Sequence, residues 1–236
     1  VPRLPLLQLR RRDADCVGPD VYSIGPEIMM AKLLQLLEEF NRKERFYVVG
    51  MTFGNKRFQL SEEFRKTLGR KLGIYVPENA FAAMDYHLDW LAASLYLTAR
   101  PGASPPHGRD AQLITGTQED IDFLVAYESD DWCYVIMLEA KGVTGFTNKQ
   151  FRLKVDRLVA MSKAPGWQSA KVIPHFALIS PKKPKRLKYD RCPDWMVEPD
   201  GEPTWIELRL PELLKRVERC DQAGTPSQQG DHWKVV

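Results

Sequence analysis

Two acids and a lysine interrupt an otherwise apolar pair of predicted strands, and these three residues are the best suited to chemistry in the chain. Asp122 begins the run 122–128, and Glu139 and Lys141 follow the run 132–138. Carboxylate oxygens can hold a divalent cation, and a nearby ammonium can stabilise charge on a phosphate. The trio therefore predicts a metal-dependent site for phosphodiester cleavage.

A β-hairpin is predicted to position these residues. The runs 122–128 and 132–138 are rich in β-branched and aromatic side chains, which favour strands. Ser129, Asp130 and Asp131 between them are typical turn residues. The pattern predicts two antiparallel strands joined by a short turn.

The length of the turn decides which face each carboxylate occupies. With a two-residue turn, Asp122 lies directly opposite Glu139, and their Cβ atoms are roughly 4.5–5.5 Å apart. Lys141 then lies on the same face, because side chains alternate along a strand. A loop with an odd number of residues would send Glu139 to the opposite face, so the functional interpretation depends on the turn.

A cross-strand ion pair is the simplest alternative, since acids and lysines at strand ends are commonly solvated and contribute little energy. However, both predicted strands are apolar on both faces, which is typical of a sheet covered by helices on each side. Charges at the end of such a sheet are costly unless they serve a function. We therefore favour the functional interpretation.

The order of elements around the hairpin resembles the PD-(D/E)XK nuclease superfamily, also called restriction-endonuclease-like. Apolar spacing predicts one helix over residues 77–97, a helix over 147–161 and a strand over 172–180. A strand is also expected before the hairpin, and residues 111–115 are its only candidate. The resemblance covers roughly residues 78–180 and implies an α/β fold with a mixed β-sheet flanked by helices in the order α-β-β-β-α-β.

The resemblance also implies a role for each residue of the trio. Asp122 and Glu139 would bind Mg²⁺ or Mn²⁺ together with the backbone carbonyl of Ala140. Lys141 would orient or deprotonate the attacking water and stabilise charge on the scissile phosphate. Ile121 stands where the family has its named proline, a departure that many members share.

Further site residues are expected on the two helices. Members of the family often carry an acid on the first helix, and Asp85 is favoured over Asp89 and Glu78 because it lies nearest the apolar stripe. Gln150, with Lys154 one turn later, resembles a Gln-x-x-x-Lys extension found in some members. A solvated polar helix face explains all of these residues equally well.

Charge is distributed unevenly along the chain, although the net charge is only +3. Residues 111–140 contain seven acids and no Lys or Arg, whereas residues 141–191 contain thirteen Lys and Arg and two acids. An acidic metal pocket beside a basic surface suits the cleavage of a polyanion, so we expect DNA, double-stranded in the first instance, as the partner. The cations expected to contact it are Lys149, Arg152, Lys154, Lys182, Lys183, Lys185 and Arg186.

The dense basic segment 182–188 has two interpretations, because a phosphate-tracking loop and a solvated connector would both have this composition. Phosphate contacts alone would provide affinity without sequence preference. Both interpretations stay open at this point.

The chain of 236 residues, 44% of them hydrophobic, is long enough to bury a real core. We divide it into an N-terminal elaboration (1–76), the nuclease-like core (77–181) and a basic connector with a C-terminal extension (182–236). The first part is expected to form a dimer interface, a target-recognition element or extra layers on the core. The elements predicted outside the core are helices over 26–40, 61–72 and 211–220 and strands over 46–53 and 204–208, followed by a polar tail.

Several other classes of protein lack support in the sequence. No apolar run approaches the ~20 residues of a membrane span. Phosphate-loop and serine-esterase motifs are absent. The four cysteines, Cys16, Cys133, Cys192 and Cys220, contain no Cys-x-x-Cys pair, which argues against zinc and disulfides and favours a reducing cytoplasm.

The sequence thus predicts a Mg²⁺-dependent DNA endonuclease, and family analogy alone suggests a bacterial restriction or defence role. The alternative is a catalytically silent domain of the same fold that binds DNA or protein. The presence of Asp122, Glu139 and Lys141 together in this sequence favours activity.

Overall fold

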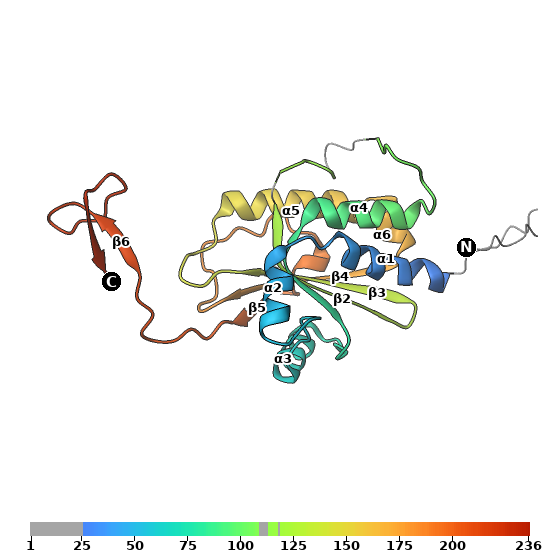
Figure 1. The fold of residues 1–236 in the computed structure, drawn as a ribbon, viewed down its shortest axis with the longest axis horizontal. Coiled ribbons are helices and arrows are strands. Elements are labelled where there is room, and N and C mark those ends of the chain that lie inside the picture. Colours follow the sequence, from blue (N-terminus) through green and yellow to red (C-terminus); the bar gives the residue numbers. More distant parts are fainter. Residues whose placement is uncertain (1–25, 109–112, 118) are drawn as a thin grey trace, which may run out of the picture.

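A five-stranded mixed β-sheet with helices on both faces forms the body of the protein in the computed structural model, which describes residues 26–108, 113–117 and 119–236 (Figure 1). Strands β1, β2 and β3 form an antiparallel meander, whereas β4 is parallel to β3 and β5 is parallel to β4. This is the predicted α/β architecture with a mixed sheet. In the order of the sheet, the strands are β1 (Phe81–His87), β2 (Asp120–Ser129), β3 (Trp132–Ala140), β4 (Val172–Ser180) and β5 (Thr204–Glu207).

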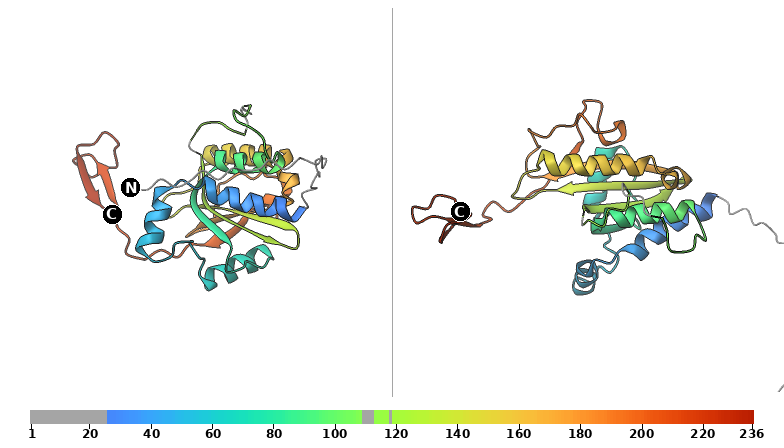
Figure 2. Two further views of the ribbon diagram at one scale, coloured as in Figure 1. Left: turned by 45° about the vertical axis from the view of Figure 1, so that its right-hand side comes forward. Right: turned by 90° about the horizontal axis from the view of Figure 1, so that it is seen from above.

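The helices cover the sheet unequally (Figure 2). Most of them lie over one face, where their apolar residues share a cluster with one side of the sheet, and α3 lies over the other face with its own cluster. The helices of the first face are α1 (Pro26–Phe40), α4 (Leu88–Ala99), α5 (Asn148–Ser162) and α6 (Pro165–Ser169), and α3 spans Glu62–Leu72. None of the described helices is both long enough and apolar enough to cross a membrane.

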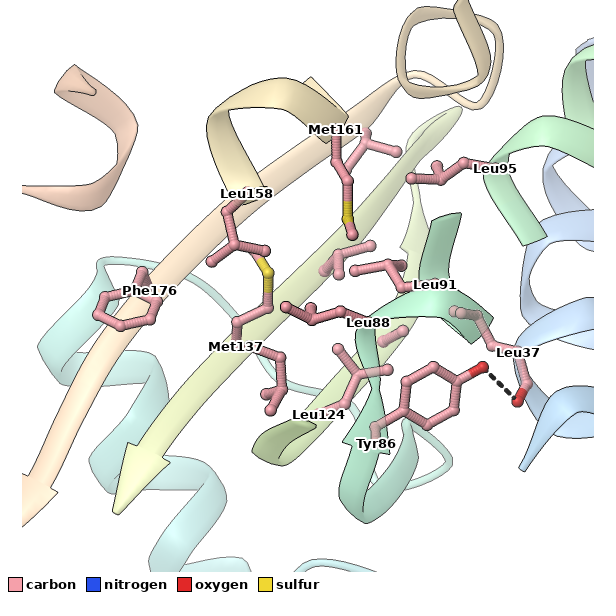
Figure 3. Close-up of a cluster of buried hydrophobic side chains, with 14 of the residues drawn as sticks. Leu37, Tyr86, Leu88, Leu91, Leu95, Leu124, Met137, Leu158, Met161 and Phe176 are labelled. Atoms are coloured by element: carbon pink, nitrogen blue, oxygen red, sulfur yellow. Dashed lines mark hydrogen bonds between the residues drawn. The ribbon is translucent and has the colours of Figure 1, made fainter. Parts of the chain in front are cut away.

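The larger core cluster lies between the sheet and helices α4 and α5 (Figure 3). Leu91 of α4, Leu158 of α5 and Met137 of β3 are completely buried there. Burying a side chain of this size stabilises the fold by about 1.5–3 kcal/mol. The Tyr86 hydroxyl donates a hydrogen bond to the Leu37 carbonyl at 2.9 Å, which ties α1 to the edge strand β1.

The β2–β3 hairpin has the predicted register. Ser129 pairs with Trp132, so Asp130 and Asp131 are the two central residues of the turn. Their φ angles of 49° and 64° are both positive, as a type I′ turn requires, and its twist matches that of the strands. The even-numbered loop keeps Asp122 and Glu139 on the same face.

The helix predicted over residues 77–97 is wrong in its first half, because Phe81–His87 is strand β1 and α4 begins only at Leu88. Both faces of the sheet are covered, so apolar residues occur on both sides of β1 and their spacing imitates a helical stripe. His87 marks the boundary, since its Nδ1 accepts the backbone N–H of Asp89 at 3.2 Å and caps α4.

Strand β1 takes the place of the strand expected at residues 111–115. Residues 111 and 112 lie outside the described part of the chain, and residues 113–115 are not in a strand. The segment instead belongs to the connection between α4 and β2.

Residues 26–76 add layers to the body, and residues 1–25 of the N-terminal elaboration lie outside the described part of the chain. The helices predicted over 26–40 and 61–72 are confirmed as α1 and α3, and the Ser61 side chain accepts the Phe64 N–H at the start of α3. The strand predicted over 46–53 is wrong, because this segment forms helix α2 (Glu44–Thr52). Its buried residues Phe46 and Gly50 lie one turn apart, so helical packing overrides β-propensity there.

The C-terminal region differs from its prediction. The strand over 204–208 is confirmed as β5, but residues 211–220 do not form a helix. β6 (Val217–Cys220) pairs instead with β7 (His232–Val235) in a small separate sheet that projects from the body (Figure 1). Leu213 is 88% exposed, so an apolar helix face would have had nothing to pack against.

Candidate active site

An open cleft of about 1110 Å³ lies between the ends of β2 and β3 and the neighbouring helix α5, and Asp122, Glu139 and Lys141 all line it. The structure therefore brings the three predicted residues together on one face. The Lys141 ammonium lies 4.0 Å from Asp122 Oδ2. Both side chains are about 30% exposed, so solvent and a ligand can reach them.

The backbone around Asp122 leaves the regular β-ladder. Pairing of β1 with β2 passes from Met84–Phe123 to Tyr86–Ile121, and the intervening Asp85 has a φ of 49°. On the other side, the Ala140 N–H donates to Asp122 Oδ2 at 2.7 Å. The Asp122 carboxylate thus accepts an N–H of the β3 backbone at the point where β2 and β3 stop pairing. Such irregularities are common beside active sites because they redirect a side chain.

Glu139 is a buried carboxylate, with only 6% of the residue exposed. Burial raises its pKa to about 7, the Lys154 ammonium opposes this rise, and the negative charge of Asp122 adds to it. A carboxyl group with this pKa holds its proton loosely near neutral pH. A further cation beside it, in addition to the Lys154 ammonium, would favour its charged form.

Lys154 of α5 extends into the cleft and supplies an internal cation. Its ammonium donates to the Glu139 carboxylate and also to the Asp120 carbonyl, the latter at 2.5 Å. Its side chain is only 13% exposed. Lys154, which was predicted to contact nucleic acid directly, is therefore engaged with the acids of the site.

Gln150 lines the same cleft from the first turn of α5. The Thr147 hydroxyl donates to Gln150 Oε1 at 3.1 Å and accepts the Gln150 N–H at 3.4 Å. This reciprocal arrangement caps the helix. Gln150 and Lys154 thus both face the cleft, as the predicted motif required, although Gln150 also has a structural role.

Asp120 is a cleft residue that the sequence analysis missed. One of its carboxylate oxygens accepts from Lys43 at 2.8 Å, and the other is buried without a hydrogen bond from any described residue. It precedes Asp122 by two residues, so the strand period was the signal that could have identified it.

The acids proposed for the first helix do not join the trio. Asp85 lies on β1 and pairs with Arg45 at 2.8 Å, and it is not among the cleft-lining residues. Glu78 is exposed in the turn before β1. Because residues 81–87 are a strand, the helical wheel that favoured Asp85 was not applicable.

Asp89, the third of these acids, is part of a buried clamp around Arg157. The Arg157 guanidinium, 5% exposed, binds both Asp89 and Glu119. Asp89 also accepts the N–H groups of Thr115 and Gly116 at 3.0 and 2.9 Å. Burial favours a higher pKa for Asp89, but these two hydrogen bonds and the Arg157 charge lower it instead. The clamp thus ties α4, which carries Asp89, to α5, which carries Arg157.

The oxygen atoms in the cleft fit a hard cation only in part. Among the described residues, no three His, Cys, Asp or Glu side chains converge closely enough to hold a metal. Asp122 and Glu139 offer two carboxylates in the cleft. The cation beside Glu139 in this structure is the Lys154 ammonium. Mg²⁺ is usually held by one or two carboxylates with water and substrate phosphate, so two acids are sufficient.

The other predicted nucleic-acid contacts lie on surfaces near the cleft. Lys149 and Arg152 are exposed on α5, and Lys182, Lys185 and Arg186 are exposed after β4. Lys183 differs from its neighbours because it forms an ion pair with Glu202 at 2.6 Å.

Comparisons with known protein families, with curated proteins and with solved structures find no match to this chain.

Proposed function

We propose that this protein is a metal-dependent endonuclease that hydrolyses phosphodiester bonds in DNA. One observation carries the proposal: the buried Glu139, with its raised pKa, shares an open cleft with Asp122 and Lys141. Placing two carboxylates and an ammonium together at the end of a buried sheet is costly, so the arrangement favours a catalytic use.

The order of elements supports a restriction-endonuclease-like core. Helix α3, the meander β1–β3, helix α5 and strand β4 follow one another as α-β-β-β-α-β, with α4 inserted between β1 and β2 and α6 inserted between α5 and β4. The candidate residues lie on β2, at and just after the end of β3, and on α5. These are the positions at which the resemblance places the two acids, the lysine and the helical extension.

Each of the cleft residues has a separate role in the proposed reaction. Asp122 and Glu139 would hold the Mg²⁺ or Mn²⁺, and the bound ion would supply a polarised water and neutralise charge on the phosphate. Lys141 orients the water and stabilises the developing negative charge. Asp120 and Lys154 keep the cleft walls together through their hydrogen bond.

A DNA- or protein-binding domain without activity is the second candidate, and the ion pair between Lys154 and Glu139 favours it. That pair already compensates the buried carboxylate with a cation from the chain itself. A domain that never binds metal would retain such a pair as a purely structural contact.

Cleavage of plasmid DNA separates the two candidates. The wild-type protein is expected to nick or cut plasmid with Mg²⁺ or Mn²⁺ and to be inactive with EDTA. Glu139→Ala and Lys141→Ala should reduce the rate by about 10²–10³-fold or more, because each removes a charge that acts on the transition state. Both variants should still bind DNA in EDTA. Glu78→Ala, an exposed acid outside the cleft, is the matched control and should cut normally.

The endonuclease proposal fails if the wild-type protein and these variants are equally inert with either metal. The substrates must include double-stranded, single-stranded and branched DNA as well as RNA. Circular dichroism of each variant verifies that it is folded.

A further inference from the structure

A second hollow lies beside the candidate active site, with a volume of about 490 Å³. It is formed by the loop after β3, residues 142–146, and the loop after β4, residues 180–187. Phe146 lines both this hollow and the cleft of the candidate active site, so the two are neighbours. Loop 142–146, which carries no charged residue, lines the second hollow.

The two hollows differ in charge, because acids and cations both line the cleft whereas only cations line the second hollow. Lys182, Lys185 and Arg186 line the second hollow, and no acid is among its lining residues. Within the described part of the chain, none of these three cations has an ion-pair partner. Lys183, in the middle of the same loop, points elsewhere: it pairs with Glu202 and does not line the hollow.

The basic loop is held in place at both ends. Asn148, the first residue of α5, donates to the Arg186 carbonyl at 3.0 Å and accepts the Lys188 N–H at 2.8 Å. At the other end, the Ser180 hydroxyl donates to the Lys182 carbonyl at 2.9 Å. A solvated connector would not need these anchors. The loop is therefore preorganised, which reduces the entropy lost on binding a ligand.

We propose that this hollow is a phosphate subsite for the DNA strand that is cut. The sugar–phosphate backbone leaves the candidate active site, passes the uncharged loop 142–146 and places a flanking phosphate beside Lys182, Lys185 and Arg186. Three unpaired cations that line one hollow on an anchored loop suit a phosphodiester, whose oxygens accept charge-assisted hydrogen bonds. This inference rests on the proposed function for its substrate. It favours phosphate tracking over the solvated connector for the basic segment.

Binding of a short fluorescent DNA duplex, followed by anisotropy in EDTA, tests the subsite without cleavage. The triple variant Lys182→Ala/Lys185→Ala/Arg186→Ala should bind at least tenfold more weakly. The slope of log K against log salt should also become shallower by about 1, since the subsite holds one phosphate and each neutralised phosphate contributes about 0.9. Lys183→Ala removes one positive charge from the same loop, at a residue outside the hollow, and should change the affinity less than about twofold.

Asn148→Ala tests the anchoring separately. It removes no charge, so the affinity should fall several-fold while the salt slope stays unchanged. The four substituted cations are exposed and Asn148 is half-buried, and thermal unfolding verifies that the variants keep their fold. The same titration with single-stranded DNA and with RNA shows which polyanion the subsite prefers.

The subsite is overturned if the triple variant binds like Lys183→Ala, or if it loses affinity with no change in salt slope. Its failure is distinguishable from failure of the endonuclease proposal. A wild-type protein that cuts plasmid, with a triple variant of normal affinity and KM, would refute the subsite alone. A protein that never cuts but loses salt-dependent binding in the triple variant would refute only the catalytic proposal.

Discussion

Glu139 illustrates how one side chain can link folding to chemistry. It lies at the end of a strand whose other residues are apolar, and burial raises its pKa to about 7. The Lys154 ammonium compensates part of this cost, and the Asp122 carboxylate adds to it. A cation bound between the two acids would relieve both effects. The two acids therefore favour a bound cation, and this is the physical basis of the proposed metal binding.

This pKa predicts a dependence of stability on pH. The ordinary pKa of 4.5 applies to the unfolded chain and about 7 to the folded one, so the folded state binds the extra proton between these values. The stabilising contribution is complete below pH 4.5 and is lost as the pH rises through 7. Without metal, wild type should therefore lose about 1–3 kcal/mol more stability from pH 5 to pH 8 than Glu139→Gln.

Urea unfolding in EDTA at both pH values measures this difference. Glu78→Gln, at an exposed site outside the cleft, should follow the wild type. Parallel pH dependence of wild type and Glu139→Gln would show that Glu139 titrates normally.

At the scale of the elements, the site depends on how α4, α5 and α6 are held over the sheet. Helices α4 and α5 carry Asp89, Lys154 and Arg157, which form the clamp and the internal cation of the cleft. Helix α6 packs against α4 at very short range, because a Cβ atom on Gly166 would lie 1.9 Å from the Leu95 carbonyl oxygen. Only glycine permits this backbone approach.

Gly166→Ala should therefore destabilise the protein by about 3 kcal/mol, since the backbone of α4 or α6 must move. The free energy of unfolding from urea titration measures the effect. Gly108→Ala is the matched control, because a Cβ there meets no atom within 4 Å, and it should change stability by less than about 0.5 kcal/mol. Equal stability of the two variants would mean that α6 is not packed on α4 in this way.

At the scale of the whole molecule, the body and the C-terminal sheet are distinct. Within the described residues, no hydrogen bond or ion pair links residues 211–236 to the sheet and its helices. β5, in contrast, is integral to the body, because Ile206 is 4% exposed and belongs to the cluster beneath α3. The segment that connects β5 to the C-terminal sheet is extended and projects from the edge of the larger sheet (Figure 1).

Removal of residues 211–236 should thus leave the body intact, with a Tm within about 2 °C of the full chain. Differential scanning calorimetry measures this. A longer truncation that also removes residues 204–210 should lower Tm much further, because it takes away β5 and its buried Ile206. A large loss of Tm in the shorter truncation would show that the C-terminal sheet supports the body.

The sequence by itself determined the features that depend on short-range rules. The register of the β2–β3 hairpin follows from two turn residues and a side-chain period of two, and with it the shared face of Asp122 and Glu139. Helices α1, α3 and α5 and strand β4 likewise followed from local apolar spacing and capping residues.

Only the tertiary structure decided the rest. β1 was mistaken for a helix because a strand covered on both faces has no alternation, so a period of two cannot be distinguished from one of 3.6. The ion pairs of Asp120, Lys154 and the Arg157 clamp join partners as distant in sequence as Lys43 and Asp120. Contacts between such residues are set by the packing of whole elements, and no local pattern in the chain encodes them.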